Sequence, residues 1–277
     1  MKPRPYTNSR GLFSLRSRVI PVLIAIAVCV VSLAAVLTGA GFVTSAEAQT
    51  PAIPAVEPSP ATAQAAVPSL SPPRSGDEPF ELVDVAAAER AGISRSVLDL
   101  ALGAVTCAVD SGDIAAPPTL TVIDYSRPST EQRLWVFDLH TGEVRFHELV
   151  AHGKGTGENL AEHFSDDMNS HQSSLGLFVT GDTYTGNNGY SLRLNGLEPG
   201  FNSRARERAI VIHGASYVDA EFAAKQGRLG RSWGCPALRE AIAHDVIDFV
   251  RDGGVIFSYY PDEAWLERSR FLHCDQS

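Results

Sequence analysis

The sequence predicts one folded domain of the mainly β or α+β class, in which a sheet or sandwich has helices packed at its edge. Two observations predict this class. Short β-branched and aromatic runs recur between residues 119 and 260, and glycine-containing turns separate several of them. Stretches with helical spacing of apolar residues stand before these runs and among the last of them. Without the segments that precede it, the folded part has about 200 residues, the size of one domain.

Residues 1–48 have the composition of an export signal. The first eighteen residues contain five bases and no acid, residues 19–43 carry no charge, and Ala46-Glu47-Ala48 has the small-x-small form of a cleavage site. We expect cleavage after Ala48 and a location in the periplasm or cell envelope. An uncleaved membrane anchor is the alternative, because the uncharged run is long enough to span a bilayer.

Removal of residues 1–48 takes away five basic residues and one acidic residue, which shifts the formal net charge from −9 to −13. Such an acidic chain is a poor partner for nucleic acid or for an anionic membrane surface. Residues 49–79 are rich in Pro, Ala and Ser and predict a disordered linker. This linker is either a tether that lets the domain reach a distant target or a spacer with no specific task.

The predicted elements follow in chain order. Residues 80–118 form a helical N-terminal segment, with a helix over 94–110 that Ser94 caps. The main part of the folded domain covers 119–277, and Thr141-Gly142 marks a tight hairpin turn within it. Helices are predicted over 217–226 and 236–252, the second ending at Gly253-Gly254. Strands are predicted over 119–126, 133–139, 143–150, 175–181, 190–196, 208–214 and 254–260.

Three cysteines remain once Cys29 leaves with the signal. An odd number in an exported protein implies a free thiol or a bond to another chain. Cys107 and Cys274 can pair, which would leave Cys235 free. The alternative is that Cys107, on an apolar helix face, is a small buried hydrophobe.

Cys235 and His213 are the candidate nucleophile and base. Pro236 suits the first position of a helix, so Cys235 is expected at the N-cap, where the macrodipole lowers the pKa of a thiol. The N–H groups around Gly234 and Cys235 are candidate oxyanion donors. His213 ends an apolar strand just before Gly214, a position suited to a catalytic base. The alternatives are a structural cysteine and a hydrogen-bonded core histidine.

The segments IHGAS at 212–216 and GRSWGCPAL at 230–238 resemble the active-site block of the L,D-transpeptidase catalytic domain family, the YkuD-type peptidoglycan cross-linkers. They are closest to the branch whose block reads SWGCPAL. The segments SRPSTEQRLWVFDLHTGEV, ELVAHGKG, SHQSSLGLFVTG and YSLRLNGLEPGFN resemble that branch too, so that the resemblance covers most of 119–262. It implies the family's β-sandwich, with Cys235 as nucleophile and His213 as general base. It also implies that Ser232 orients His213 through its backbone carbonyl, and that Gly214, Trp233 and Gly234 provide backbone near the oxyanion.

The block departs from the commoner family pattern at two positions. Trp233 replaces a His, and Ala237 stands where that pattern has an Arg. Arg193 and Arg231 are candidates for the missing cation, or they are ordinary exposed arginines. His152 and His171, in polar loops, either line the substrate cleft or are solvated.

The resemblance implies an exported, cysteine-dependent L,D-transpeptidase that acts on peptidoglycan stem peptides through a thioester. Its donor would be a tetrapeptide whose third residue is a diamino acid. The alternatives are an L,D-carboxypeptidase or cysteine peptidase that trims wall peptides, and a non-catalytic wall-binding domain. We expect a monomer with no cofactor. We also expect no metal, because the sequence has no HExxH and no Cys-x-x-Cys pair. We also expect no nucleic-acid partner, and contact with the membrane only through residues 19–43 if they are uncleaved.

Overall fold

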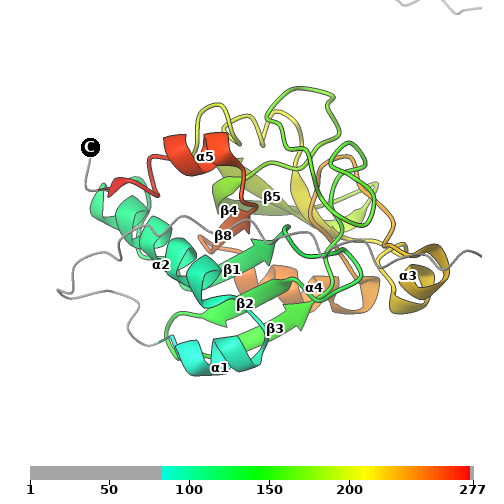
Figure 1. Cartoon of the computed structure of the whole chain (residues 1–277), viewed down its shortest axis with the longest axis horizontal. Helices are drawn as coiled ribbons and strands as arrows, with labels where there is room; N and C mark the ends of the chain where they lie inside the picture. The colour runs from blue at the N-terminus through cyan, green and yellow to red at the C-terminus, as the bar shows by residue number, and fades with distance from the viewer. Residues whose placement is uncertain (1–82, 275–277) are drawn as a thin grey trace, which may run out of the picture. The chain divides into compact units, whose positions relative to one another are not determined.

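The computed structural model describes residues 83–274, so the predicted export signal and linker lie outside the described residues. Within this range eight strands pair into one continuous sheet, in the order β3-β2-β1-β8-β4-β5-β6-β7. Five helices accompany the sheet (Figure 1). The mainly β or α+β class predicted from the sequence is confirmed.

The elements follow one another as α1 (Val85–Arg90), α2 (Arg95–Asp110), β1 (Thr119–Asp124), β2 (Leu134–Asp138), β3 (Val144–Glu148), β4 (Gly176–Gly186), β5 (Gly189–Gly196), β6 (Val211–Gly214), α3 (Ala220–Gln226), β7 (Ala237–Leu238), α4 (Glu240–Val250), β8 (Val255–Tyr259) and α5 (Glu263–Arg268).

The core is built around β1 and β8, which lie side by side in parallel, with Leu120 opposite Val255. Every residue of both strands is buried, which requires cover on both faces of the sheet. Figure 1 shows α2 in front of these strands and α4 behind them. The helices suit this position because each has an apolar stripe: Ala243, Val246, Ile247 and Val250 of α4 are buried and recur at helical spacing.

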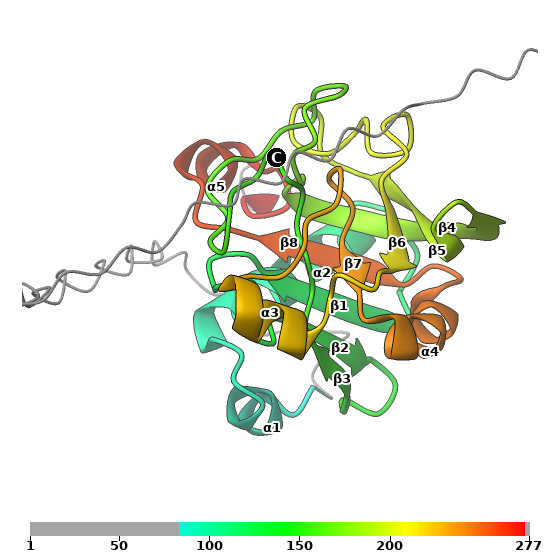
Figure 2. The same ribbon diagram turned by 90° about the vertical axis from the view of Figure 1, so that its right-hand side faces the viewer.

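The β6–β7 edge of the sheet carries the candidate site. Figure 2 faces this edge, with α3 and α4 on the same side of the molecule. His213 of β6 is paired in parallel with Ala237 of β7, and Gly214 with Leu238. Ala237 also exchanges backbone hydrogen bonds with Ala151, at N–O distances of 2.9 and 3.4 Å. These pairings hold the chain extended just after Cys235.

That extended chain corrects one prediction. The helix expected from Pro236 begins only at Glu240, with Arg239 as its N-cap residue. Strand pairing on both sides of Ala237 outweighs the preference of proline for a first helical turn. The Arg239 guanidinium also forms a bidentate pair with Glu148 of β3, at 2.8 and 2.9 Å, which fixes where α4 starts.

Other expected bounds also shifted. The strand expected from residue 208 begins at Val211, because Ala209 has a positive φ of 55° and lies in a turn. α1 and α5 were not predicted as separate elements. α5 begins after Asp262, whose carboxylate accepts a hydrogen bond from the Trp265 N–H at 2.8 Å and so caps the helix.

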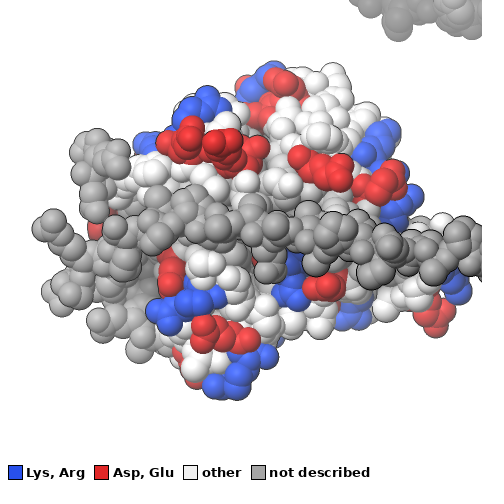
Figure 3. Space-filling view, viewed as in Figure 1, with Lys and Arg blue, Asp and Glu red and all other residues white. Residues whose placement is uncertain are grey.

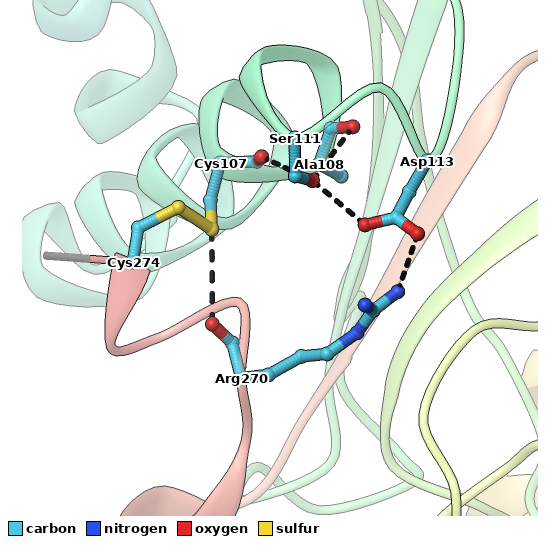
Figure 4. Close-up of a disulfide and its surroundings, with 6 residues drawn as sticks. All are labelled: Cys107, Ala108, Ser111, Asp113, Arg270 and Cys274. Carbon is cyan, nitrogen blue, oxygen red and sulfur yellow. Dashed lines mark hydrogen bonds and ion pairs between the residues drawn. A yellow bond between two sulfur atoms is a disulfide. The ribbon is translucent and has the colours of Figure 1, made fainter. Parts of the chain in front are cut away.

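A disulfide joins Cys107 of α2 to Cys274, with their Cα atoms 5.7 Å apart, and Cys235 is the free cysteine of the described residues (Figure 4). The predicted pairing is therefore confirmed. Figure 4 also shows Arg270 reaching Asp113, with 2.7 Å between Nη2 and Oδ1. The C-terminal segment is thus attached to α2 and the loop after it by a covalent bond and an ion pair.

On the face shown in Figure 3, basic and acidic side chains are interspersed, with no large patch of one sign among the visible coloured residues. Among residues 83–274, no helix combines the length and the apolar character that crossing a bilayer requires.

Candidate active site

Cys235 lies in a tight turn that Ser232 closes. The Ser232 hydroxyl donates to the Cys235 carbonyl at 2.6 Å and accepts from the Gly234 N–H at 3.1 Å. Gly234 has a φ of +118°, and a Cβ at this position would come 2.7 Å from the Gln172 carbonyl oxygen. Glycine is therefore required beside the cysteine for both conformation and space.

The thiol of Cys235 is buried, with 8 % of the residue exposed, and its Sγ lies 3.7 Å from the Ala209 carbonyl oxygen. Burial raises the pKa of this thiol, while a hydrogen bond from the Val211 backbone and the charge of Arg208 act in the opposite direction. The expected lowering by a helix dipole is wrong, because α4 begins five residues after Cys235 and dipole effects fade within one turn.

His213 lies on the strand next to this cysteine. Since His213 pairs with Ala237, the register places Cys235, two residues earlier, beside Val211. The His213 Nδ1 lies 2.9 Å from the Gly214 carbonyl oxygen and donates to it, which leaves Nε2 as the free acceptor of the neutral ring. Burial lowers the pKa of His213, so the imidazole is neutral at pH 7. A neutral imidazole with a free Nε2 has the form that a general base needs.

The structure assigns the orientation of His213 to Gly214 rather than to Ser232. The Ser232 carbonyl accepts the Lys154 N–H at 2.9 Å instead. The Gly234 N–H, expected as an oxyanion donor, is bonded to the Ser232 hydroxyl. Ser232 thus shapes the turn around Cys235 and does not contact the His213 ring.

Neither arginine proposed from the sequence contacts Cys235. Arg193 pairs with Asp182 at 3.0 Å and lies over the Tyr184 ring, and Arg231 pairs with Glu158 at 2.6 Å. The cation whose charge acts on Cys235 is Arg208, which the sequence reasoning missed. One sequence feature could have indicated Arg208: it stands directly before the apolar run that leads to His213.

Arg208 is almost fully buried, with 3 % of its side chain exposed, and lies 3.8 Å from Asp166. Its Nη1 donates to the Ser165 carbonyl and the Ser174 hydroxyl, each at 2.6 Å. Its Nη2 donates to the Gln172 carbonyl at 2.6 Å and the Ser170 hydroxyl at 3.1 Å. Arg208 therefore holds the 165–174 loop, whose Gln172 carbonyl packs against Gly234.

The two loop histidines have different environments. His152 is buried: its Nδ1 accepts from Arg133 at 2.8 Å, and burial, followed by the Arg133 charge, lowers its pKa to about 4. Its side chain is therefore not solvated. His171 is half-buried, and its ring stacks on Trp233 with 4.9 Å between centroids. Trp233 is 70 % exposed and precedes Cys235 by two residues in the sequence. We call the stacked rings of His171 and Trp233 the aromatic rim.

Among residues 83–274 there is no group of three or more His, Cys, Asp or Glu side chains that could hold a metal ion. A hollow of about 370 Å³ is lined by residues of the 154–163 loop and by Arg231. Its lining includes Lys154, whose Nζ lies 5.4 Å from the centre of the Trp233 ring. Neither Cys235 nor His213 is part of its lining.

Comparison with known proteins identifies the family. The family model described as the L,D-transpeptidase catalytic domain matches residues 89–259. The chain belongs to this family, as the resemblance of its active-site block implied. A search of curated proteins finds no match.

Solved structures of low similarity are also found. An L,D-transpeptidase from Mycobacterium smegmatis is 16% identical with a TM-score of 0.33, over 52% of this chain and 59% of that one. An L,D-transpeptidase from Stackebrandtia nassauensis is 15% identical with a TM-score of 0.32, over 64% and 75%. One from Xylanimonas cellulosilytica is 16% identical with a TM-score of 0.30, over 55% and 67%. This chain thus spans about three fifths of the Mycobacterium smegmatis protein.

Proposed function

We propose that this protein is an exported L,D-transpeptidase that cross-links peptidoglycan stem peptides through a thioester on Cys235. One observation carries the proposal: in a chain of this family, the only free thiol of the described residues lies on the segment next to a strand that presents a neutral histidine. The Cys107–Cys274 disulfide supports export, because such bonds persist in oxidising compartments.

The reaction proceeds in two transfers. In the first, Cys235 Sγ attacks the carbonyl carbon of the diamino acid at the third position of a donor tetrapeptide, while His213 Nε2 takes the thiol proton. The carbon–sulfur bond forms, the amide bond to the terminal D-alanine breaks, and His213 passes the proton to the departing amine. In the second, an acceptor amine attacks the thioester, loses its proton to His213 and restores the thiol.

Burial of both groups favours a neutral thiol and a neutral imidazole in the resting enzyme. Proton transfer is then part of the attack itself and does not precede it. Neutral resting groups suit a buried site, because a permanent buried ion pair would carry a large desolvation cost.

The test is incubation of the purified protein with a donor tetrapeptide and an acceptor stem peptide, followed by mass spectrometry. We expect a cross-linked product and release of D-alanine, and both should disappear in Cys235→Ala. Cys235→Ser should lose nearly all turnover, since a hydroxyl lacks the nucleophilicity of a thiolate.

Three results contradict the proposal. Release of D-alanine without cross-linking would show a carboxypeptidase that transfers to water. Peptide binding without any release would show a wall-binding domain. Full activity in a folded Cys235→Ala variant would place the nucleophile elsewhere.

A further inference from the structure

Lys154 is attached to the same turn as the candidate nucleophile. Its backbone N–H donates to the Ser232 carbonyl at 2.9 Å, and the residue before it, Gly153, forms a parallel bridge with Ser232. Its Nζ lies 5.4 Å from the centre of the Trp233 ring. The backbone contacts therefore hold the ammonium group of Lys154 at the aromatic rim, next to the turn that contains Cys235.

Lys154 is exposed, and its ammonium group has no carboxylate partner within residues 83–274. Most described arginines and the other described lysine, Lys225, do contact a carboxylate; Arg133 and Arg268 bind backbone carbonyls instead. Glu162 is the complementary case, an exposed carboxylate with no basic partner in the described residues.

Lys154 and Glu162 line the same hollow of about 370 Å³, together with the exposed apolar side chain of Leu160 and with His163. The other two charged residues of the lining, Glu158 and Arg231, form an ion pair at 2.6 Å, and Glu158 also pairs with Arg228, outside the lining, at 2.7 Å. Lys154 and Glu162 are therefore the positive and the negative group of the lining that have no ion-pair partner in the described residues. A ligand of matching form carries an ammonium and a carboxylate close together.

We propose that this hollow is a subsite for the zwitterionic amino-acid end of a diamino-acid side chain, and that it selects a free carboxylate over a carboxamide. Lys154 binds the carboxylate and Glu162 binds the ammonium, while Leu160 and Trp233 contact the aliphatic stem. The inference rests on the proposed function, because it takes a peptidoglycan stem peptide as the ligand. Amidation removes the charge that Lys154 recognises and leaves its ammonium unpaired, which is the basis of the selection.

The test compares two tetrapeptides that differ only in whether the diamino-acid side chain ends in a carboxylate or a carboxamide. In the wild type, kcat/KM should favour the carboxylate by about tenfold, which corresponds to about 1.4 kcal/mol. Lys154→Gln should bring the ratio close to one. Lys225→Gln, on α3, is the matched control and should keep the wild-type ratio. Glu162→Gln should lower kcat/KM for both peptides and keep their ratio.

A ratio near one in the wild type, or an unchanged ratio in Lys154→Gln, would overturn the subsite. A binding measurement separates this result from failure of the proposed function. Trp233 is the exposed tryptophan, whereas Trp135 and Trp265 are fully buried, so indole fluorescence reports on the rim. Both peptides are titrated into Cys235→Ala, with and without Lys154→Gln. If the wild type turns over neither peptide, a carboxylate preference in binding that Lys154→Gln removes still supports the subsite, and equal binding overturns it.

Discussion

At the scale of single residues, the surroundings of Cys235 and His213 set the protonation states on which the proposed mechanism depends. Burial raises the pKa of the thiol and lowers that of the imidazole, so both groups are driven toward their neutral forms. The Gly214 carbonyl fixes the ring tautomer. In the proposed mechanism, the proton therefore moves during the attack, and no thiolate–imidazolium pair forms beforehand.

This environment predicts the pH dependence of thiol alkylation. Because the pKa of Cys235 lies above its usual value of 9.0, the rate with iodoacetamide should still be rising at pH 9. A rate that levels off below pH 8 would show a stable thiolate and contradict the assignment. Cys235→Ala supplies the blank, since the other two described cysteines are joined in a disulfide.

Arg208 should act on the same measurement as a positioning residue. Loss of its charge in Arg208→Met removes a group that favours the thiolate, so alkylation at pH 8 should slow by roughly threefold or more. Arg208→Lys retains the charge and should alkylate faster than Arg208→Met. Arg193→Met, which removes an arginine paired with Asp182, is the control and should match the wild type. Equal rates in Arg208→Met and the wild type, with near-UV circular dichroism confirming the fold, would exclude this role.

The sequence predicts which residues carry the candidate chemistry but not the electrostatics around them. The motif around Cys235 and the strand end at His213 are local features. The pKa of Cys235, in contrast, depends on burial, on the Val211 backbone and on the charge of Arg208, an environment that forms only when distant parts of the chain fold together. Arg193 and Arg231 were candidates by charge, yet in the structure Arg193 pairs with Asp182 and Arg231 pairs with Glu158.

At the scale of elements, strongly periodic segments were predictable and short segments fixed by long-range contacts were not. The helix expected over 94–110 matches α2, and the Thr141-Gly142 turn joins β2 and β3 as expected, with Gly142 at a φ of +76°. The two-residue strand β7 has no sequence signal of its own, because it exists through pairing with β6 and Ala151. α5 has only six residues, too few to show a period.

The attachment of α5 depends on one buried carboxylate. Glu198 accepts the Leu177 N–H of β4 at 2.7 Å and the Trp265 Nε1–H of α5 at 3.0 Å. Burial raises the pKa of this carboxylate. Burying this carboxylate costs free energy, and its two oxygens compensate by accepting the hydrogen bonds of Leu177 and Trp265.

Removal of these acceptors in Glu198→Ala leaves two buried donors unsatisfied and should cost about 2–4 kcal/mol in the free energy of unfolding. Glu198→Gln keeps one acceptor oxygen without a buried charge and should cost less. Urea unfolding followed by tryptophan fluorescence measures both, because Trp265 is buried in the affected region. Glu207→Ala, an exposed residue, should be neutral. A Glu198→Ala variant as stable as the wild type would show that the donors find water instead.

At the scale of the whole molecule, the disulfide closes almost the entire described domain into one loop. Cys107 and Cys274 are separated by 167 positions, a span that contains every strand of the sheet, Cys235 and His213. Sequence reasoning could predict this pair because an odd cysteine count leaves few combinations, whereas the ion pair between Arg270 and Asp113 that accompanies it required the structure.

Loss of this bond should destabilise the folded domain chiefly by freeing the unfolded chain, by about 5 kcal/mol on the chain-entropy model. The experiment introduces Cys107→Ala/Cys274→Ala into a Cys235→Ala parent and compares their thermal unfolding, so that no free thiol of residues 83–274 can exchange. The midpoint should fall by several degrees in the double variant, and dithiothreitol should lower the midpoint of the parent alone. Because the site lies on β6 and the turn before β7, away from both cysteines in the chain, Cys107→Ala/Cys274→Ala with Cys235 intact should still alkylate at the wild-type rate at 25 °C. Stability unaffected by the double substitution would mean that the Arg270–Asp113 pair and the packing of α5 hold the C-terminal segment without the covalent bond.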